Sequence, residues 1–298
     1  MSLRAIFLLA VLWCCTGPTH AQDFNHGCTG YIDSLPATIV KPGTWCLRRN
    51  MLAPAGGSLA ALTILADDVT IDCRGFRIRA IPGGAPSQKL GISSIDRNNT
   101  TVRGCKVRGF WGGILLGGER GLVVQDNLVE DSAYIGIYLD GRASTISGNT
   151  VVRTGGTTDL SLVIGIHARG GADVMDNTIV DLSPPSGRTP AQIAGRISMV
   201  GIFAVLNAGS ISRNRIRQET TFPPHRLIGI QVASRRRPWS PAILAIVHHN
   251  DLIGPGGTGT EGIDCFGSSD TLVAGNMVNG FATGVDDSCT SQDNHVLD

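Results

Sequence analysis

The chain has 298 residues, of which 42% are hydrophobic and 16% charged, and its formal net charge is +1 at neutral pH. A charge so close to zero gives no overall attraction to nucleic acid or to an anionic membrane, so we expect neither as a partner. Glycine is frequent, at 39 residues, and aromatic residues make up only 5%, which is typical of short strands joined by turns.

The first 21 residues have the form of a cleaved signal peptide. A short basic start at residues 1–4 precedes an apolar run at residues 6–15, and Thr19-His20-Ala21 resembles a small-residue cleavage site. The apolar run is too short to span a bilayer, and no later segment is long and apolar enough. We therefore predict a secreted or periplasmic protein without a membrane span, beginning at Gln22, with a formal charge of about zero once Arg4 is removed.

The cysteines predict disulfides. Loss of the leader leaves six of them: Cys28, Cys46, Cys73, Cys105, Cys265 and Cys289. An even number in an exported chain without a CxxC pair favours disulfides over metal sites, although six cysteines allow fifteen connectivities. Closeness along the chain favours a Cys28–Cys46 bridge near the start and a Cys265–Cys289 bridge near the end. Free buried thiols are the alternative.

Residues 22–66 are predicted to form an N-terminal cap. This segment contains Pro36, Pro42 and an aliphatic run at residues 59–65, but it lacks the repeated phrase of the later chain. A solenoid needs its open end covered, and a segment of different pattern at the start suits that role.

Residues 67–298 repeat a glycine followed by an aliphatic residue. The copies are Gly91-Ile92, Gly113-Ile114, Gly136-Ile137, Gly165-Ile166, Gly201-Ile202, Gly229-Ile230, Gly262-Ile263 and Gly284-Val285. Successive copies are 22 to 36 residues apart, and an asparagine follows each copy from the second onward. Short alternating apolar runs between these markers predict strands. A period of this size predicts an all-β solenoid in which each copy is one coil.

The repeat suggests a role for each marker. We expect the isoleucines to point inward as a stack, and the glycine to allow a sharp turn into the strand. The asparagines are expected at a bend, where their side-chain amides can form a ladder between coils.

Two segments, VTIDCRGFRI at residues 69–78 and TVRGCKVRGF at residues 101–110, resemble the opening coils of the pectin-lyase-like superfamily and its NosD-like repeat proteins. The resemblance covers the chain from about Leu65 to the C-terminus. It implies a single-stranded right-handed parallel β-helix, for which we expect eight to ten coils. It also implies extracellular or periplasmic work on polysaccharides, by lyases, hydrolases, epimerases or non-catalytic binders.

Outward positions of the repeat place one group of polar and aromatic residues together. With the isoleucine inward, the next residue and the one two further on point outward. This alternation predicts a cluster of Tyr138, Asp140, His167 and Arg169, with Phe203 one coil further on. Arginine can neutralise the carboxylate of a uronic acid, and histidine and tyrosine can exchange protons with the sugar, as β-elimination requires. Tyr138, His167 and Arg169 are therefore the catalytic candidates.

Further residues are candidates for binding substrate. Asp140, Phe203 and Gln231 line the same face, and Arg235 and Trp239 lie in an apparent insertion where a cation beside an indole suits an anionic glycan. Exposed polar residues on a solvated sheet need no function, and this reading stays open for all of them.

An alternative acidic site consists of Asp264 and Asp286 on adjacent coils, with Asp287 beside them. Stacked carboxylates can act as an acid–base pair or bind Ca²⁺. The Gly-His-Gly motif expected of pectin-degrading hydrolases is absent from the sequence. The pair His248-His249 would need further ligands to hold a metal, and the repeat register supplies none, so no metal site is assigned.

The sequence thus predicts a monomeric, exported β-helix protein that binds an acidic polysaccharide and is a lyase if it is an enzyme. A non-catalytic glycan-binding or surface-adhesion solenoid and a glycoside hydrolase remain alternatives. No cofactor is required, and Ca²⁺ is the one optional ion.

Overall fold

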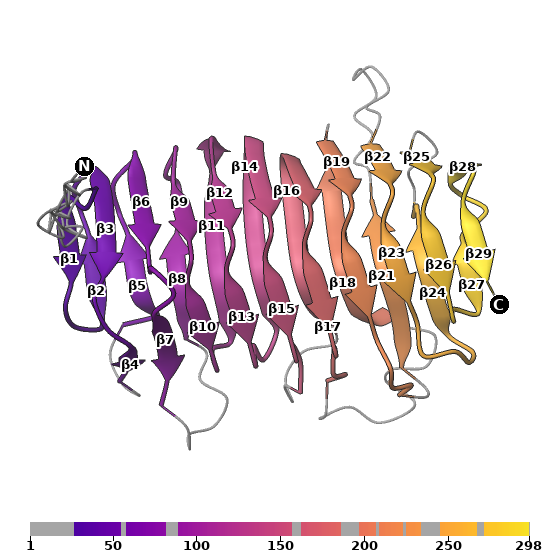
Figure 1. Ribbon diagram of the computed structural model, residues 1–298, viewed down its shortest axis with the longest axis horizontal. Helices are drawn as coiled ribbons and strands as arrows, with labels where there is room; N and C mark the ends of the chain where they lie inside the picture. The colour runs from indigo at the N-terminus through magenta and orange to yellow at the C-terminus, as the bar shows by residue number, and fades with distance from the viewer. Residues whose placement is uncertain are drawn as a thin grey trace, which may run out of the picture.

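The computed structural model describes residues 27–54, 58–81, 89–156, 162–185, 197–206, 209–222, 225–233, 245–266 and 271–297. These residues contain strands, turns and bends but no helix, and every strand pairing between them is parallel. The strands stack coil upon coil from the N-terminus to the C-terminus and form one elongated body (Figure 1). The predicted all-β parallel β-helix is confirmed.

Each coil contributes strands to three faces. Face 1 consists of β2 (Ala37–Ile39), β5 (Ala60–Ile64), β8 (Leu90–Ser94), β11 (Gly112–Arg120), the first halves of β14 (Ile135–Ser147) and β16 (Val163–Met175), β18 (Ile197–Leu206), β21 (Arg226–Val232), β24 (Thr260–Asp264) and β27 (Thr283–Val285). Face 2 consists of β1 (Gly30–Ile32), β3 (Gly43–Leu47), β6 (Val69–Asp72), β9 (Thr101–Arg103), β12 (Val123–Gln125), the second halves of β14 and β16, β19 (Gly209–Ser212), β22 (Ala245–His248), β25 (Thr271–Ala274) and β28 (Thr290–Gln292).

Face 3 is a separate ten-stranded sheet. Its strands are β4 (Met51–Ala53), β7 (Arg77–Ala80), β10 (Lys106–Arg108), β13 (Leu128–Glu130), β15 (Thr150–Val152), β17 (Thr178–Val180), β20 (Arg215–Arg217), β23 (Asp251–Ile253), β26 (Met277–Asn279) and β29 (His295–Leu297). One face 3 strand per coil gives ten coils among the described residues, the upper end of the predicted range.

The core is a set of aliphatic rows that run along the axis. The predicted inward row is fully buried and comprises Ile92, Ile114, Ile137, Ile166, Ile202, Ile230 and Ile263. Faces 2 and 3 supply further rows, such as Val124 and Ile146 on face 2. Burial of apolar area at about 25 cal/mol per Å² is the main stabilising contribution, and each coil gains it only against its neighbours.

The repeated glycines serve close packing, and the predicted reason, a sharp turn, is wrong. The glycines that precede the inward isoleucines do not have the positive φ angles found elsewhere in the described backbone. A Cβ on Gly165 would lie 2.6 Å from the carbonyl oxygen of Gly201 and 2.9 Å from a methyl carbon of Ile179. Only a residue without a Cβ fits where face 3 meets face 1.

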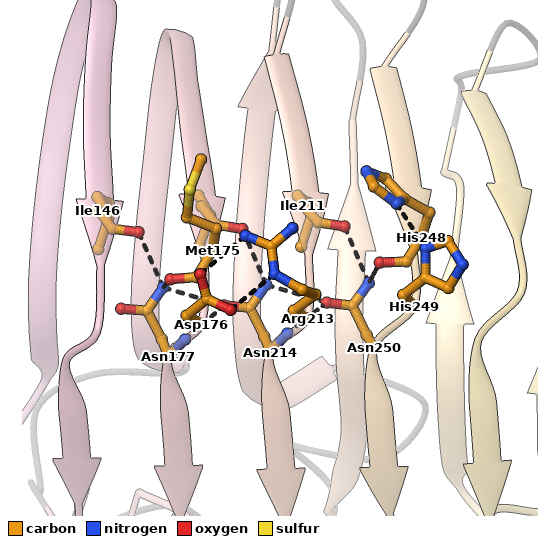
Figure 2. Close-up of polar contacts among 11 residues, drawn as sticks. Ile146, Met175, Asp176, Asn177, Ile211, Arg213, Asn214, His248, His249 and Asn250 are labelled. Carbon is orange, nitrogen blue, oxygen red and sulfur yellow. Dashed lines mark hydrogen bonds and ion pairs between the residues drawn. The ribbon is translucent and has the colours of Figure 1, made fainter.

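The asparagines form the predicted ladder at the corner between faces 2 and 3. The backbone N–H and side-chain amide of Asn177 both donate to Asn214 Oδ1, each at 3.0 Å, and the amide also donates to Ile146 O at 2.9 Å (Figure 2). The bend itself lies one residue earlier, because Asp176 and Arg213 have φ angles of 58° and 53°. The asparagines therefore satisfy buried backbone groups, and the preceding residues make the turn.

The coils begin before residue 67, where the sequence analysis placed the boundary with the cap. Strands β2, β3 and β4 pair in parallel with β5, β6 and β7 and so form a complete coil within residues 22–66. Strand β1 pairs with β3 at the N-terminal end of face 2. In the described residues the parallel strand pairing is thus continuous across the predicted boundary. The segment predicted as a cap is itself a coil, because its strands pair through their backbones with the next coil.

Three disulfides link neighbouring parts of the structure. The bridges Cys28–Cys46 and Cys265–Cys289, which proximity favoured, are both present, and the third joins Cys73 to Cys105 on successive coils. No helix among the described residues is long and apolar enough to cross a membrane. The predicted leader lies outside the described residues.

Candidate functional site

The outward row of face 1 brings the predicted residues into one line. Parallel pairing places Tyr138 beside His167, His167 beside Phe203, Phe203 beside Gln231 and Gln231 beside Asp264. Each step joins adjacent coils, which are roughly 4.8 Å apart in a β-sheet. The register read from the Gly-Ile repeat therefore predicts this row correctly.

Three neighbouring members of the row are ring side chains in contact. Tyr138 and His167 meet edge to face, with ring centroids 5.2 Å apart and an interplanar angle of 87°. His167 and Phe203 have centroids 4.9 Å apart and are tilted by 31°. All three side chains are half-buried, so part of each ring is open to solvent. We call Tyr138, His167 and Phe203 the ring row.

Arg169, Asp140 and the Tyr138 hydroxyl form a chain of polar contacts beside the ring row, which we call the polar border. Arg169 Nη1 donates to the Tyr138 hydroxyl at 3.3 Å, and that hydroxyl donates to Asp140 Oδ2 at 3.2 Å. Arg169 Nε lies 3.6 Å from the same carboxylate oxygen. Burial raises the pKa of Tyr138, with the charge of Asp140 acting in the same direction, so the phenol stays protonated at neutral pH. The guanidinium is thus already partnered and holds the phenol in one orientation.

His167 is neutral at physiological pH. Burial, followed by the positive charge of Arg169, lowers the pKa of its imidazole from 6.5 to about 4. Its Nε2 atom is inaccessible to solvent and has no hydrogen-bond partner among the described residues. A buried, unpaired ring nitrogen is costly in a folded protein, and such atoms are often explained by a ligand or an ordered water.

A surface hollow of about 540 Å³ opens beside Tyr138. It is lined by Ile95, Asp96, Asn98, Gly117, Gly118, Glu119, Tyr138 and Asp140. Gly118 shapes its wall, since a Cβ at this position would lie 2.0 Å from the carbonyl oxygen of Arg97. The hollow carries carboxylates and no basic lining side chain. Of these lining residues the sequence analysis predicts only Tyr138 and Asp140. The others come from earlier coils, whose outward positions show no cluster of polar and aromatic residues.

The acidic pair lies at the far end of the same row. Asp264 is buried and accepts a hydrogen bond of 2.8 Å from the Gln231 amide, which is buried too. Burial raises the pKa of Asp264, and the charges of Glu261 and Asp286 act in the same direction. Hydrogen bonds from Ser288 lower the pKa of Asp286, which remains partly exposed. The pKa values of the two carboxyl groups are therefore shifted in opposite directions, and this difference could not be predicted from the sequence.

The structure does not bring the remaining predicted site residues, Asp287, Arg235 and Trp239, into a described cluster. Asp287 lies exposed in the turn after Asp286, with no metal-binding group of three or more His, Cys, Asp or Glu in the described part of the chain. Arg235 and Trp239 fall within residues 234–244, outside the described residues.

Residues 66–216 match the family described as "Right handed beta helix region". No curated protein matches the chain. A solved structure of DFA-IIIase from Arthrobacter chlorophenolicus A6, in complex with DFA-III, is 15% identical, with a TM-score of 0.43 over 84% of this chain and 61% of that one. The Agl-KA catalytic domain is 12% identical, with a TM-score of 0.47 over 90% of this chain and 57% of that one. This chain thus spans less than two thirds of the length of either.

Proposed function

The chain belongs to the right-handed β-helix family, and from that premise we propose that it binds a polysaccharide along face 1, over the ring row. The observation that carries the proposal is the contact of Tyr138, His167 and Phe203 on three successive coils. The part-exposed rings form an apolar strip that can contact successive sugars, while polar groups beside the strip can bond hydroxyls. Three disulfides suit the oxidising compartment to which the predicted leader would direct the chain.

The polar border bears on which glycan is bound. Arg169 places a guanidinium beside the ring row, where a uronate carboxylate could reach it, and its side chain is one third exposed. Asp140 already lies beside it, so a uronate would have to compete with Asp140 for the guanidinium. An acidic polysaccharide therefore fits only if its carboxylate reaches Arg169 and stays clear of the carboxylates of the hollow.

Binding can be tested by calorimetric titration of the mature protein with neutral and uronate oligosaccharides of matched length. We expect Phe203→Ala to weaken binding by about two- to ten-fold, since an aromatic contact contributes about 0.5–1.5 kcal/mol. Leu115→Ala is the matched control, because Leu115 occupies the same outward row one coil before Tyr138. Equal weakening by both substitutions, or by neither, would contradict binding over the ring row.

If the bound glycan is a uronate, the neutral imidazole and the protonated phenol support β-elimination. In that reaction His167 would take the proton next to the carboxylate, and Tyr138 would protonate the leaving oxygen. The product is an unsaturated uronate, which absorbs ultraviolet light as neither hydrolysis products nor bound glycan do. A rise in absorbance that is lost in both His167→Ala and Arg169→Ala is the expected result, and a flat trace across all uronates rejects elimination.

A second candidate, glycoside hydrolysis, is favoured by the opposite pKa directions of Asp264 and Asp286. One carboxyl with a raised pKa beside another with a lowered pKa is the arrangement that separates the acid and base roles in a hydrolase. Release of reducing ends without ultraviolet absorbance, abolished by Asp264→Asn, would support it. Hydrolysis that survives this substitution would exclude the pair.

A further inference from the structure

Two adjacent histidines lie at the C-terminal end of strand β22, on face 2 and at its corner with face 3. His248 is the last residue of β22, and His249 forms the corner between faces 2 and 3 (Figure 2). Their Nδ1 atoms are 2.8 Å apart, and their rings are inclined by 80° with centroids 5.1 Å apart. Neither residue contacts the ring row, so the proposed glycan site does not use them.

The asparagine ladder fixes the backbone that carries both rings. His249 has a φ angle of 54°, and its N–H donates to Ala274 O at 3.3 Å. The amide of Asn250 donates to His248 O at 3.2 Å and to Asn276 on the next coil at 2.9 Å. The His249 ring also packs over Gly275, where a Cβ would lie 3.4 Å from Nε2. The two imidazoles are thus presented by a rigid corner, which lowers the entropic cost of holding them together.

The charges around the pair tolerate a cation. The nearest positive group is Arg213 on the preceding coil, and Asp176 pairs with both its Nε and its Nη2 at 2.8 Å (Figure 2).

The two Nδ1 atoms are joined by a hydrogen bond of 2.8 Å, so each lies within reach of an ion that the other binds. With metal–nitrogen bonds of about 2.0–2.1 Å, a rotation of the rings would turn both lone pairs toward one metal ion. Of the divalent ions that imidazole suits, Cu²⁺ is bound most tightly.

We propose that His248 and His249 form a two-imidazole site for a divalent transition metal, with Cu²⁺ preferred and the other positions open to water or a small ligand. Both rings bind through Nδ1. The proton of the hydrogen bond between the two Nδ1 atoms moves through solvent to Nε2 of its own ring, which frees both Nδ1 lone pairs for the metal. Within the described residues no third His, Cys, Asp or Glu completes a cluster, which leaves these positions open.

The test is titration of the untagged mature protein with Cu²⁺, Ni²⁺ and Zn²⁺ in a non-chelating buffer, followed by calorimetry and, for Cu²⁺, electron paramagnetic resonance. We expect one Cu²⁺ per chain with coupling to two imidazole nitrogens, and weaker binding of both Ni²⁺ and Zn²⁺. His248→Gln and His249→Gln should each lower Cu²⁺ affinity by at least ten-fold and leave coupling to one nitrogen.

His295→Gln is the matched control, since His295 is exposed on face 3 of the last coil. It should leave Cu²⁺ affinity unchanged, and circular dichroism should show that all variants are folded. Retention of wild-type affinity in both His248→Gln and His249→Gln, or equal loss in His295→Gln, would overturn the site. Tighter binding of Zn²⁺ than of Cu²⁺ would overturn the preference for Cu²⁺. Glycan binding is independent of all these outcomes.

Discussion

Two rows of side chains run along this β-helix, and they differ in how much they vary from coil to coil. The asparagine ladder repeats one residue, from Asn127 to Asn276, and its interior members are buried with their amides bonded on both sides. The outward row of face 1 changes at every coil and contains a buried ring nitrogen that has no partner among the described residues. Repetition thus marks positions that hold coils together, and variation marks positions whose side chains the contacts between coils do not dictate.

The largest change in the free energy of unfolding is expected from a substitution in the asparagine ladder. Asn177→Ala removes the acceptor for the N–H and amide of Asn149 and the donor to Ile146 O, all of them buried. Each buried group left unpaired costs about 1–3 kcal/mol, so we expect a loss of about 3–5 kcal/mol in the free energy of unfolding. Urea denaturation measures it. Asn279→Ala, at an exposed asparagine on β26, is the control and should cost less than about 0.5 kcal/mol.

A smaller effect is expected from the glycine that precedes each inward isoleucine. Gly165→Ala forces a Cβ against the backbone oxygen of Gly201, and overpacking of this kind costs about 1–3 kcal/mol. Gly117→Ala on the outward face meets its first neighbour, an Ile95 methyl carbon, only at 3.6 Å and should be nearly neutral. Thermal melts of the two variants would contradict the packing argument if they shifted equally.

His167 should make stability depend on pH. Its pKa is about 4 in the folded protein against 6.5 when unperturbed, so the unfolded chain binds a proton first as the pH falls. Stability is therefore lost as the pH falls from 6.5 to 4, by about 1–2 kcal/mol, because solvent at the exposed part of the ring screens its charge.

Denaturation of wild type and His167→Gln across this pH range tests the assignment. The difference between their unfolding free energies should change with pH only in this window, whereas His295→Gln should parallel the wild type. A difference that is constant with pH would mean that His167 titrates alike in both states.

The smallest effect on stability is expected in the polar border. Tyr138→Phe removes the hydroxyl that links Arg169 to Asp140 but leaves the ring, so stability should change by less than about 1 kcal/mol. Glycan affinity should fall several-fold, because Arg169 is no longer held in place. A larger loss of stability than of affinity would assign the hydroxyl to the fold and not to the site.

The stacking of coils can be predicted from the sequence, because the same inward side chains and asparagines recur in each coil and give the sequence a period. The isoleucine row, the asparagine ladder and the register that aligns Tyr138 with His167 all follow from that period. The first coil was missed because it lies in the segment without the Gly-Ile phrase, although its strands pair in the same way.

The role of an individual position, by contrast, depends on its neighbours in three dimensions. The close approach of Gly165 to Gly201, the hollow beside Tyr138 and the opposite pKa directions of Asp264 and Asp286 depend on atoms from neighbouring coils. Those coils are some 20 to 40 residues away in sequence, and connections of irregular length separate them. Burial and electrostatic fields are properties of three-dimensional neighbours, so a periodic pattern predicts which residues align but not how they affect one another.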